Sequence, residues 1–132
     1  MTEVKAGRKR YTTLNAKGET LLTSRVYKEA ALERRCLVLS SGFYEWRHYG
    51  EKAYSYHIKV KGKELFYIAE VWQAWTDKET GETMDTFALV TTEANELISE
   101  VHNKKKRMPT ILTTETAEAW MNPDLSEKRS RK

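Results

Sequence analysis

Three polar residues in this sequence have the types and settings that proton-transfer chemistry uses. Asn15 lies in the stretch LNAKGET, Glu45 is enclosed by aromatic residues in FYEW, and His102 precedes a run of cations in EVHNKKKRMP. A carboxyl group in a half-desolvated cleft has a raised pKa and can donate or accept a proton. The three groups together could therefore position and protonate a small polar electrophile. Each also has a plainer interpretation, such as a solvated strand-edge carboxylate for Glu45 or a helix C-terminal cap for His102.

Other recognisable chemical motifs are missing from the sequence. It has no GxGxxG, P-loop, HExxH or GxSxG pattern. Its single cysteine, Cys36, excludes an intrachain disulfide and a cysteine-based zinc cage, so we expect no metal and no cofactor. We also expect a cytoplasmic protein with no membrane partner, because no apolar stretch is long enough to cross a bilayer and no leader precedes the chain.

Basic residues are clustered along the chain. The net charge is only +4, from 23 Lys and Arg against 19 Asp and Glu. Three short stretches hold many of the cations: Lys5–Arg10, Lys104–Arg107 and Lys128–Lys132. Clustered cations favour a polyanion such as nucleic acid as the partner, although terminal clusters are often only solvated tails. The middle cluster lies between an expected helix and an expected strand, so its geometry should be fixed.

The hydrophobic pattern predicts an α+β fold in one domain, residues 1–132. We expect a strongly bent, barrel-like, mainly antiparallel sheet with about three short helices, an arm or edge strand over 1–13 and a tail over 122–132. Strands are expected at 36–39, 43–47, 54–60, 65–72, 86–91 and 109–112. Helices are expected over 24–35, from Thr92 or Asn95 to about 102, and after Thr113 or Thr114. Val26, Ala30 and Ala31 should line the inner side of the first helix.

The stretch SSGFYEW should form a turn or bulge followed by a strand. Gly42, as a glycine, is free to adopt a positive φ there. Because side chains alternate along a strand, Phe43 and Glu45 should point to one face, and Tyr44 and Trp46 to the other.

Four segments, in this order and spacing, resemble the SOS response-associated peptidase (SRAP) family: NAKGET, RRCLVLSSGFYEW, TTEANELISEVHNKKKRMPTIL and AEAWM. Members of that family usually show N-A-R-x-E-T, R-C-L-[VI]-P-x-x-G-[FY]-[YF]-E-W and I-H-x-R-M-P. The resemblance extends from about Asn15 to Met121. It implies that Glu45 is the active-site carboxyl and that its aromatic neighbours form the walls of the site.

The resemblance implies a function on damaged DNA. SRAP proteins bind single-stranded DNA and shield abasic sites as a DNA–protein crosslink, formed when an N-terminal cysteine condenses with the sugar aldehyde into a thiazolidine. Asn15 would orient that N-terminal residue, and Glu45 and His102 would move protons. Lys17 stands where the family usually has an arginine near the phosphates. DNA contacts are expected from Lys17, Trp46 and the cluster Lys104, Lys105, Lys106 and Arg107.

Departures from the family pattern concern the nucleophile. The chain begins Met1-Thr2-Glu3 instead of Met-Cys-Gly-Arg, and Cys36 matches an internal cysteine of the family. Leu39 replaces a common proline, and the sequence covers the middle of an SRAP domain. We therefore expect crosslinking to be lost. The family's peptidase (autoproteolytic) and lyase-like activities stay open for this chain. A non-catalytic nucleic-acid-binding remnant and a protein-interaction module with a vestigial site are the alternatives.

Overall fold

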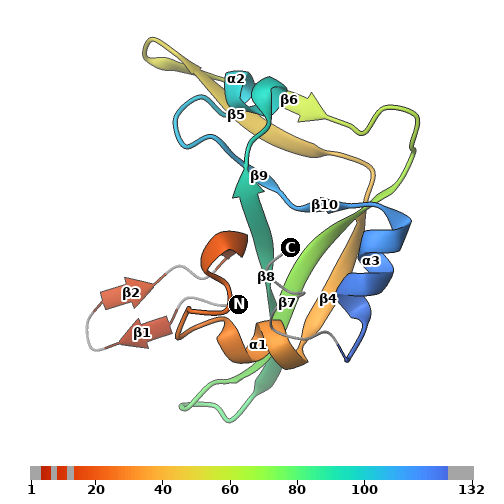
Figure 1. Ribbon diagram of the computed structural model, residues 1–132. Helices are drawn as coiled ribbons and strands as arrows, with labels where there is room; N and C mark the ends of the chain where they lie inside the picture. The colour runs from red at the N-terminus through yellow and green to blue at the C-terminus, as the bar shows by residue number, and fades with distance from the viewer. Residues whose placement is uncertain (1–3, 7–8, 12–13, 125–132) are drawn as a thin grey trace.

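The computed structural model describes residues 4–6, 9–11 and 14–124, and the side chains of residues 14–124. The predicted α+β class and bent sheet are confirmed: a curled half-barrel sheet is joined to two small antiparallel hairpins (Figure 1). The strands are β1 (Val4–Ala6), β2 (Lys9–Tyr11), β3 (Asn15–Lys17), β4 (Arg35–Ser40), β5 (Phe43–Tyr49), β6 (Lys52–Ile58), β7 (Phe66–Thr76), β8 (Thr83–Glu93), β9 (Arg107–Pro109) and β10 (Ile111–Leu112). The helical elements are the 3₁₀ turn η1 (Gly18–Thr20), α1 (Lys28–Glu33), α2 (Glu96–Val101) and α3 (Thr114–Met121).

Strands β7 and β8 form the centre of the main sheet as a long antiparallel pair. Strand β7 also pairs with β4 and β10, while β8 pairs with β9 and, in parallel, with β3. The sheet is therefore mixed, with one parallel pair among antiparallel ones. Strands β10 and β8 pair with successive stretches of β7, and the sheet as a whole is curled.

The two faces of the main sheet have different roles. One face carries small and branched apolar residues that pack against η1 and α1, with a core of Ala16, Leu21, Leu22, Ala30, Ala31, Ala69, Val71, Ala88 and Val90. On the opposite face, the register aligns Asn15 with Leu89, Leu89 with Glu70, and Glu70 with Cys36. Partners in adjacent strands share a face, so this row of four residues crosses the sheet on the side away from the core.

A buried arginine joins two helices to β4. The Arg35 guanidinium donates to the carbonyl oxygens of Ala31 and Leu32 at the end of α1, at 2.7 and 2.9 Å, and to those of Trp120 and Asn122 at the end of α3, both at 2.6 Å. The last carbonyls of a helix have no partner within the helix. Arg35 supplies hydrogen bonds to both helix ends and also lies over the Trp120 ring, 5.7 Å from its centroid.

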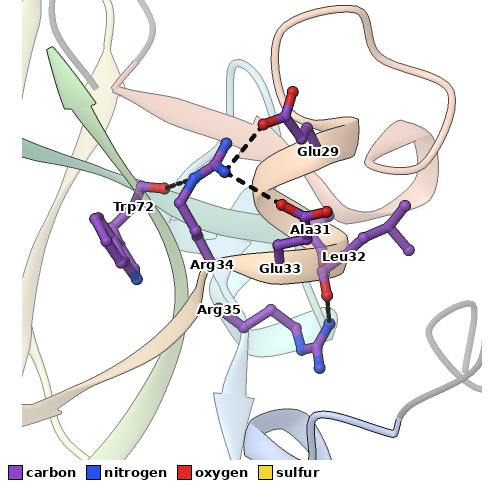
Figure 2. A network of polar contacts seen from close by, with 7 residues as sticks. All are labelled: Glu29, Ala31, Leu32, Glu33, Arg34, Arg35 and Trp72. Atoms are coloured by element: carbon purple, nitrogen blue, oxygen red, sulfur yellow. Dashed lines mark hydrogen bonds and ion pairs between the residues drawn. The ribbon is translucent and has the colours of Figure 1, made fainter.

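The preceding residue fastens the same helix to β7. Figure 2 shows Arg34 donating to the Glu29 carboxylate at 3.1 Å and to the Trp72 carbonyl at 3.2 Å, with Arg35 beside it reaching Leu32. Consecutive arginines therefore tie α1 to two different elements.

Hairpin β5–β6 forms its own two-stranded sheet at one end of the molecule, with Glu45 opposite Tyr56 (Figure 1). Gly42 does not use the positive φ that is open to a glycine, whereas Gly50 at the hairpin turn does. Gly42 is required for space instead, since a Cβ there would lie 2.5 Å from Nε2 of His57 and 2.9 Å from the Ile58 carbonyl oxygen.

The first helix is shorter than the sequence predicted. It begins at Lys28, because the Ser24 hydroxyl accepts from the N–H groups of Val26 and Tyr27 in a separate turn. It ends at Glu33, because Arg35 already pairs with β7. Val26 is 48% exposed and does not line the core.

The other helix starts follow local capping. The expected caps Asn95 and Thr113 are confirmed, each accepting from an N–H three residues later. Strands β1 and β2 lie within the expected N-terminal arm and pair with each other, whereas residues 125–132 of the expected tail lie outside the described residues.

Replacing Arg35 with methionine should destabilise the fold strongly. The change preserves bulk but leaves four helix-end carbonyls without their donor, of which the contact with Ala31 is buried and the others are partly buried, at a cost of about 3 kcal/mol. Urea denaturation measures the free energy of unfolding. The matched change Arg34→Met, at a residue with fewer carbonyl contacts, should cost about 1 kcal/mol; equal losses would contradict the proposed importance of Arg35.

Candidate functional site

Glu45 lies on the inner face of hairpin β5–β6. The expected alternation is confirmed, since Phe43 and Glu45 are partly buried whereas Tyr44 and Trp46 are exposed. Only 18% of the Glu45 side chain is exposed, and this burial raises the pKa of its carboxyl, an effect that the charge of His102 opposes. Phe43, on the same face, packs edge-on against Phe66 of β7, with ring centroids 6.5 Å apart. The Glu45 face therefore turns toward the main sheet.

His102 caps the C-terminal end of α2 and directs its ring toward Glu45. Its Nδ1 atom lies 3.9 Å from Oε2 of Glu45, 2.7 Å from the Arg107 carbonyl oxygen and 3.1 Å from the Arg107 backbone nitrogen. One nitrogen cannot both donate to the carbonyl and accept from the N–H. We assign the proton to Nδ1 because the contact with the oxygen is shorter. Nε2 is then the ring nitrogen that can accept a proton.

Asn15 and Lys17 are exposed residues of β3. Asn15 aligns with Leu89 and Lys17 with Thr91, so both follow the sheet face that carries Glu70 and lies away from the core. Phe66 belongs to that same face by its spacing along β7. Because Phe66 contacts Phe43, the strand β3 residues and Glu45 border the same side of the half-barrel.

The guanidinium of Arg107 has protein partners. It forms two hydrogen bonds to the Glu19 carboxylate, at 2.9 and 3.0 Å, and two more to the carbonyl and hydroxyl of Thr91, both at 3.0 Å. The Arg107 hydrogen bonds lower the pKa of Glu19 from 4.5 to about 2. Since the Arg107 main chain also holds the His102 ring, this ion pair anchors the segment that orients the imidazole.

The three lysines of the basic cluster form an exposed loop between α2 and β9. Lys106 has a φ of +51°, an uncommon value for a residue with a side chain. Its N–H donates to the His102 carbonyl and its carbonyl accepts from the Ala94 N–H, so the strained residue is held at both ends. Lys104, Lys105 and Lys106 thus lie in a defined turn that begins two residues after His102.

Trp46 lies on the opposite face of the hairpin from Glu45 and is 55% exposed. On that outer face, the rings of Tyr44 and His57 stack with centroids 4.6 Å apart. The hairpin therefore presents aromatic rings to solvent on one side and the carboxyl on the other.

Cys36 borders a shallow hollow of about 250 Å³ on the main sheet, beside Glu70, Trp72 and Phe87. Burial, and then the neighbouring Glu70, raise the pKa of the Cys36 thiol to about 11. A thiol of this kind is almost entirely protonated at neutral pH and is a poor nucleophile.

The described residues contain no group of three His, Cys, Asp or Glu side chains placed to hold a metal ion. No helix in the described part of the chain has the length and apolar character needed to cross a membrane.

Comparison with known proteins identifies the family. The sequence model of the SOS response associated peptidase (SRAP) family matches residues 2–132. The chain belongs to the SRAP family. The abasic site processing protein YoqW of Bacillus subtilis is 34% identical over 114 residues, which cover 86% of this chain and 49% of that protein. The abasic site processing protein HMCES of Gallus gallus is 30% identical, over 85% of this chain and 38% of that protein.

A solved structure supports the fold. A protein from Bacteroides thetaiotaomicron superimposes with a TM-score of 0.86 at 41% identity, covering 90% of this chain and 51% of that one. The chain therefore spans about half the length of YoqW and of the Bacteroides protein, and 38% of HMCES.

Three residues near the candidate site were not identified from the sequence. Tyr56 lies opposite Glu45 in the hairpin, and the alternation along its strand indicated only which face it shares. Glu19 binds Arg107 across 88 positions, which no local pattern can reveal. Asn103 binds the backbone of His48 across 55 positions.

Replacing Glu19 with glutamine should destabilise the protein in a pH-dependent way. Because the folded-state pKa of Glu19 lies near 2, below its ordinary 4.5, the stabilisation is complete above about pH 4.5 and is lost as the pH falls toward 2. With 44% of the side chain exposed, we expect about 1 kcal/mol at neutral pH. Denaturant titrations of both proteins across pH 2–7 measure the difference, and a constant difference would refute the ion-pair explanation.

Proposed function

We propose that this SRAP chain binds single-stranded DNA and acts at abasic sites, with Asn15, Glu45 and His102 at the reacting centre. The observation that carries the proposal is the close approach of Glu45 to His102 beside the lysine loop. The names of the relatives YoqW and HMCES as abasic site processing proteins support it.

The two proton-transfer groups suit the chemistry of an open-ring sugar aldehyde. An amine and an aldehyde form a Schiff base with loss of water, and this step needs an acid that protonates the departing oxygen. Glu45, with its raised pKa, is suited to that role. His102 would accept a proton at Nε2, and the Asn15 amide would hold the reacting amine.

The basic loop and Lys17 are the proposed phosphate contacts. Lys104, Lys105 and Lys106 are exposed and are separated from His102 only by Asn103, so a DNA backbone bound by these lysines would lead to the site. Arg107 would contribute mainly through orientation, because its guanidinium is bound to Glu19. Trp46 would stack a neighbouring base on the outer face of the hairpin, since base–aromatic stacking tolerates any sequence.

Nucleic-acid binding without chemistry is the second candidate. It is favoured by Cys36, the only thiol in the 132 residues, whose raised pKa makes it a weak nucleophile. Glu45 and His102 would then contribute only polar contacts to DNA. A test of adduct formation separates this candidate from the first.

Changing Lys104, Lys105 and Lys106 to alanine should weaken binding of a single-stranded oligonucleotide and flatten its salt dependence. The slope of log K against log salt is negative, and each lost phosphate contact reduces its magnitude by about 0.7. Fluorescence anisotropy over a series of salt concentrations measures this. The matched control changes Lys59, Lys61 and Lys63, which are also exposed, to alanine; an equal loss in both variants would show that only net charge matters.

Incubation with an abasic single-stranded oligonucleotide should give no denaturation-resistant adduct unless a reductant is present. A Schiff base through an amine hydrolyses on denaturation, whereas borohydride reduces it to a stable secondary amine. We expect the trapped adduct to fall at least tenfold in Glu45→Gln, because the proton donor is lost. A reductant-independent band would mean that another nucleophile operates, and no trapped band at all would favour binding alone.

A further inference from the structure

Asn103 binds the edge of the hairpin that carries Glu45. Its Oδ1 accepts from the His48 N–H at 3.0 Å, and its Nδ2 donates to the His48 carbonyl at 2.6 Å. The carboxamide thus meets both backbone polar groups of one residue. In Figure 1, α2, which ends just before Asn103, lies beside β5.

An asparagine side chain is suited to this contact because it carries the same donor and acceptor as a peptide bond. Alternate residues of a two-stranded sheet direct their N–H and C=O groups away from the partner strand. His48 pairs with Ala53 in the hairpin, and its outward groups meet the Asn103 amide instead of a third strand. Because the contact consists of two hydrogen bonds, it fixes both the position and the orientation of β5 relative to Asn103.

The location of this contact links it to the site. Asn103 follows His102 directly, and His48 lies three residues after Glu45, or about 10 Å along the strand. At the other end of β5, Phe43 packs against Phe66. Glu45 therefore lies between two points at which the hairpin is fastened.

We propose that Asn103 is a positioning residue that sets the distance between Glu45 and His102. The inference rests on the proposed function only in that Glu45 and His102 are taken to transfer protons. The Arg107 main chain holds His102 to the main sheet, whereas Glu45 belongs to the separate hairpin. Without the Asn103 contact the hairpin is fastened by Phe43 and its chain connections, and the carboxyl moves away from the imidazole.

The experiment measures the interaction between the two groups without DNA. The Glu45 carboxyl is titrated by NMR in the protein of native sequence and in His102→Gln. This change removes the imidazole whose positive charge, once Nε2 is protonated, lowers the pKa of Glu45. The same pair of titrations is repeated with Asn103→Ala. We expect the effect of His102→Gln on the Glu45 midpoint to shrink at least twofold in the Asn103→Ala background. Arg47 and Tyr56, which share the hairpin face with Glu45, are unchanged throughout.

Two further variants separate positioning from general destabilisation. Asn95→Ala removes the N-terminal cap of α2, at a cost of about 1 kcal/mol, and leaves the Asn103 contact in place. Its Glu45–His102 interaction should be unchanged. Asn103→Asp keeps the acceptor for the His48 N–H but loses the donor to the carbonyl, so an intermediate effect is expected.

The proposal would be overturned if His102→Gln shifted the Glu45 midpoint by the same amount in both Asn103 variants as in the native background. It would also be overturned if Asn95→Ala reduced that shift as much as Asn103→Ala does. Because no DNA is present, these outcomes are independent of the abasic-site experiment. If the titrations succeed and no trapped adduct forms, the positioning role stands and the proposed chemistry fails.

Discussion

The two groups of the candidate site belong to different parts of the fold, and their short separation is the constraint on which the rest depends. Glu45 is carried by the β5–β6 hairpin, whereas His102 is held by the main chain of β9, an edge strand of the main sheet. The two sheets share no strand pairing among the described elements. Side chains such as Phe43, Phe66 and Asn103 therefore decide how the proton-transfer groups meet.

The pKa values of two carboxyl groups in this region, those of Glu45 and Glu19, are shifted in opposite directions. Burial raises the pKa of Glu45, whereas hydrogen bonds from Arg107 lower the pKa of Glu19 to about 2. A protonatable group and a permanent anion thus flank the same histidine segment. Arg107 connects them, because its guanidinium binds Glu19 and its backbone contacts the imidazole.

Small residues on the core face of the main sheet, together with Arg35, hold the helices and β4 in place behind the candidate site. Alanines such as Ala69 and Ala88 let α1 and η1 pack closely on the core face. Arg35 then joins the ends of α1 and α3 to β4, the strand that leads into the hairpin through Gly42. The face opposite the core is thereby left to carry Asn15 and to border the Glu45 side of the hairpin.

The sequence by itself determined the features that depend on near neighbours along the chain. Alternation in FYEW assigned Glu45 and Trp46 to opposite faces, and the caps Asn95 and Thr113 were readable because each bonds an N–H only three residues away. Motif order also indicated the SRAP family, and the hydrophobic pattern indicated the bent sheet.

Tertiary structure alone decided the features that depend on which strands become neighbours. The need for space at Gly42, the Glu19–Arg107 pair and the Asn103 contact with His48 all involve contacts that local propensity does not encode. Residues 55 or 88 positions apart meet only after sheet register and hairpin placement are set. In the sequence, Asn103 looks like an ordinary turn residue. Its role cannot be predicted there, because its partner is a strand edge that exists only in the folded protein.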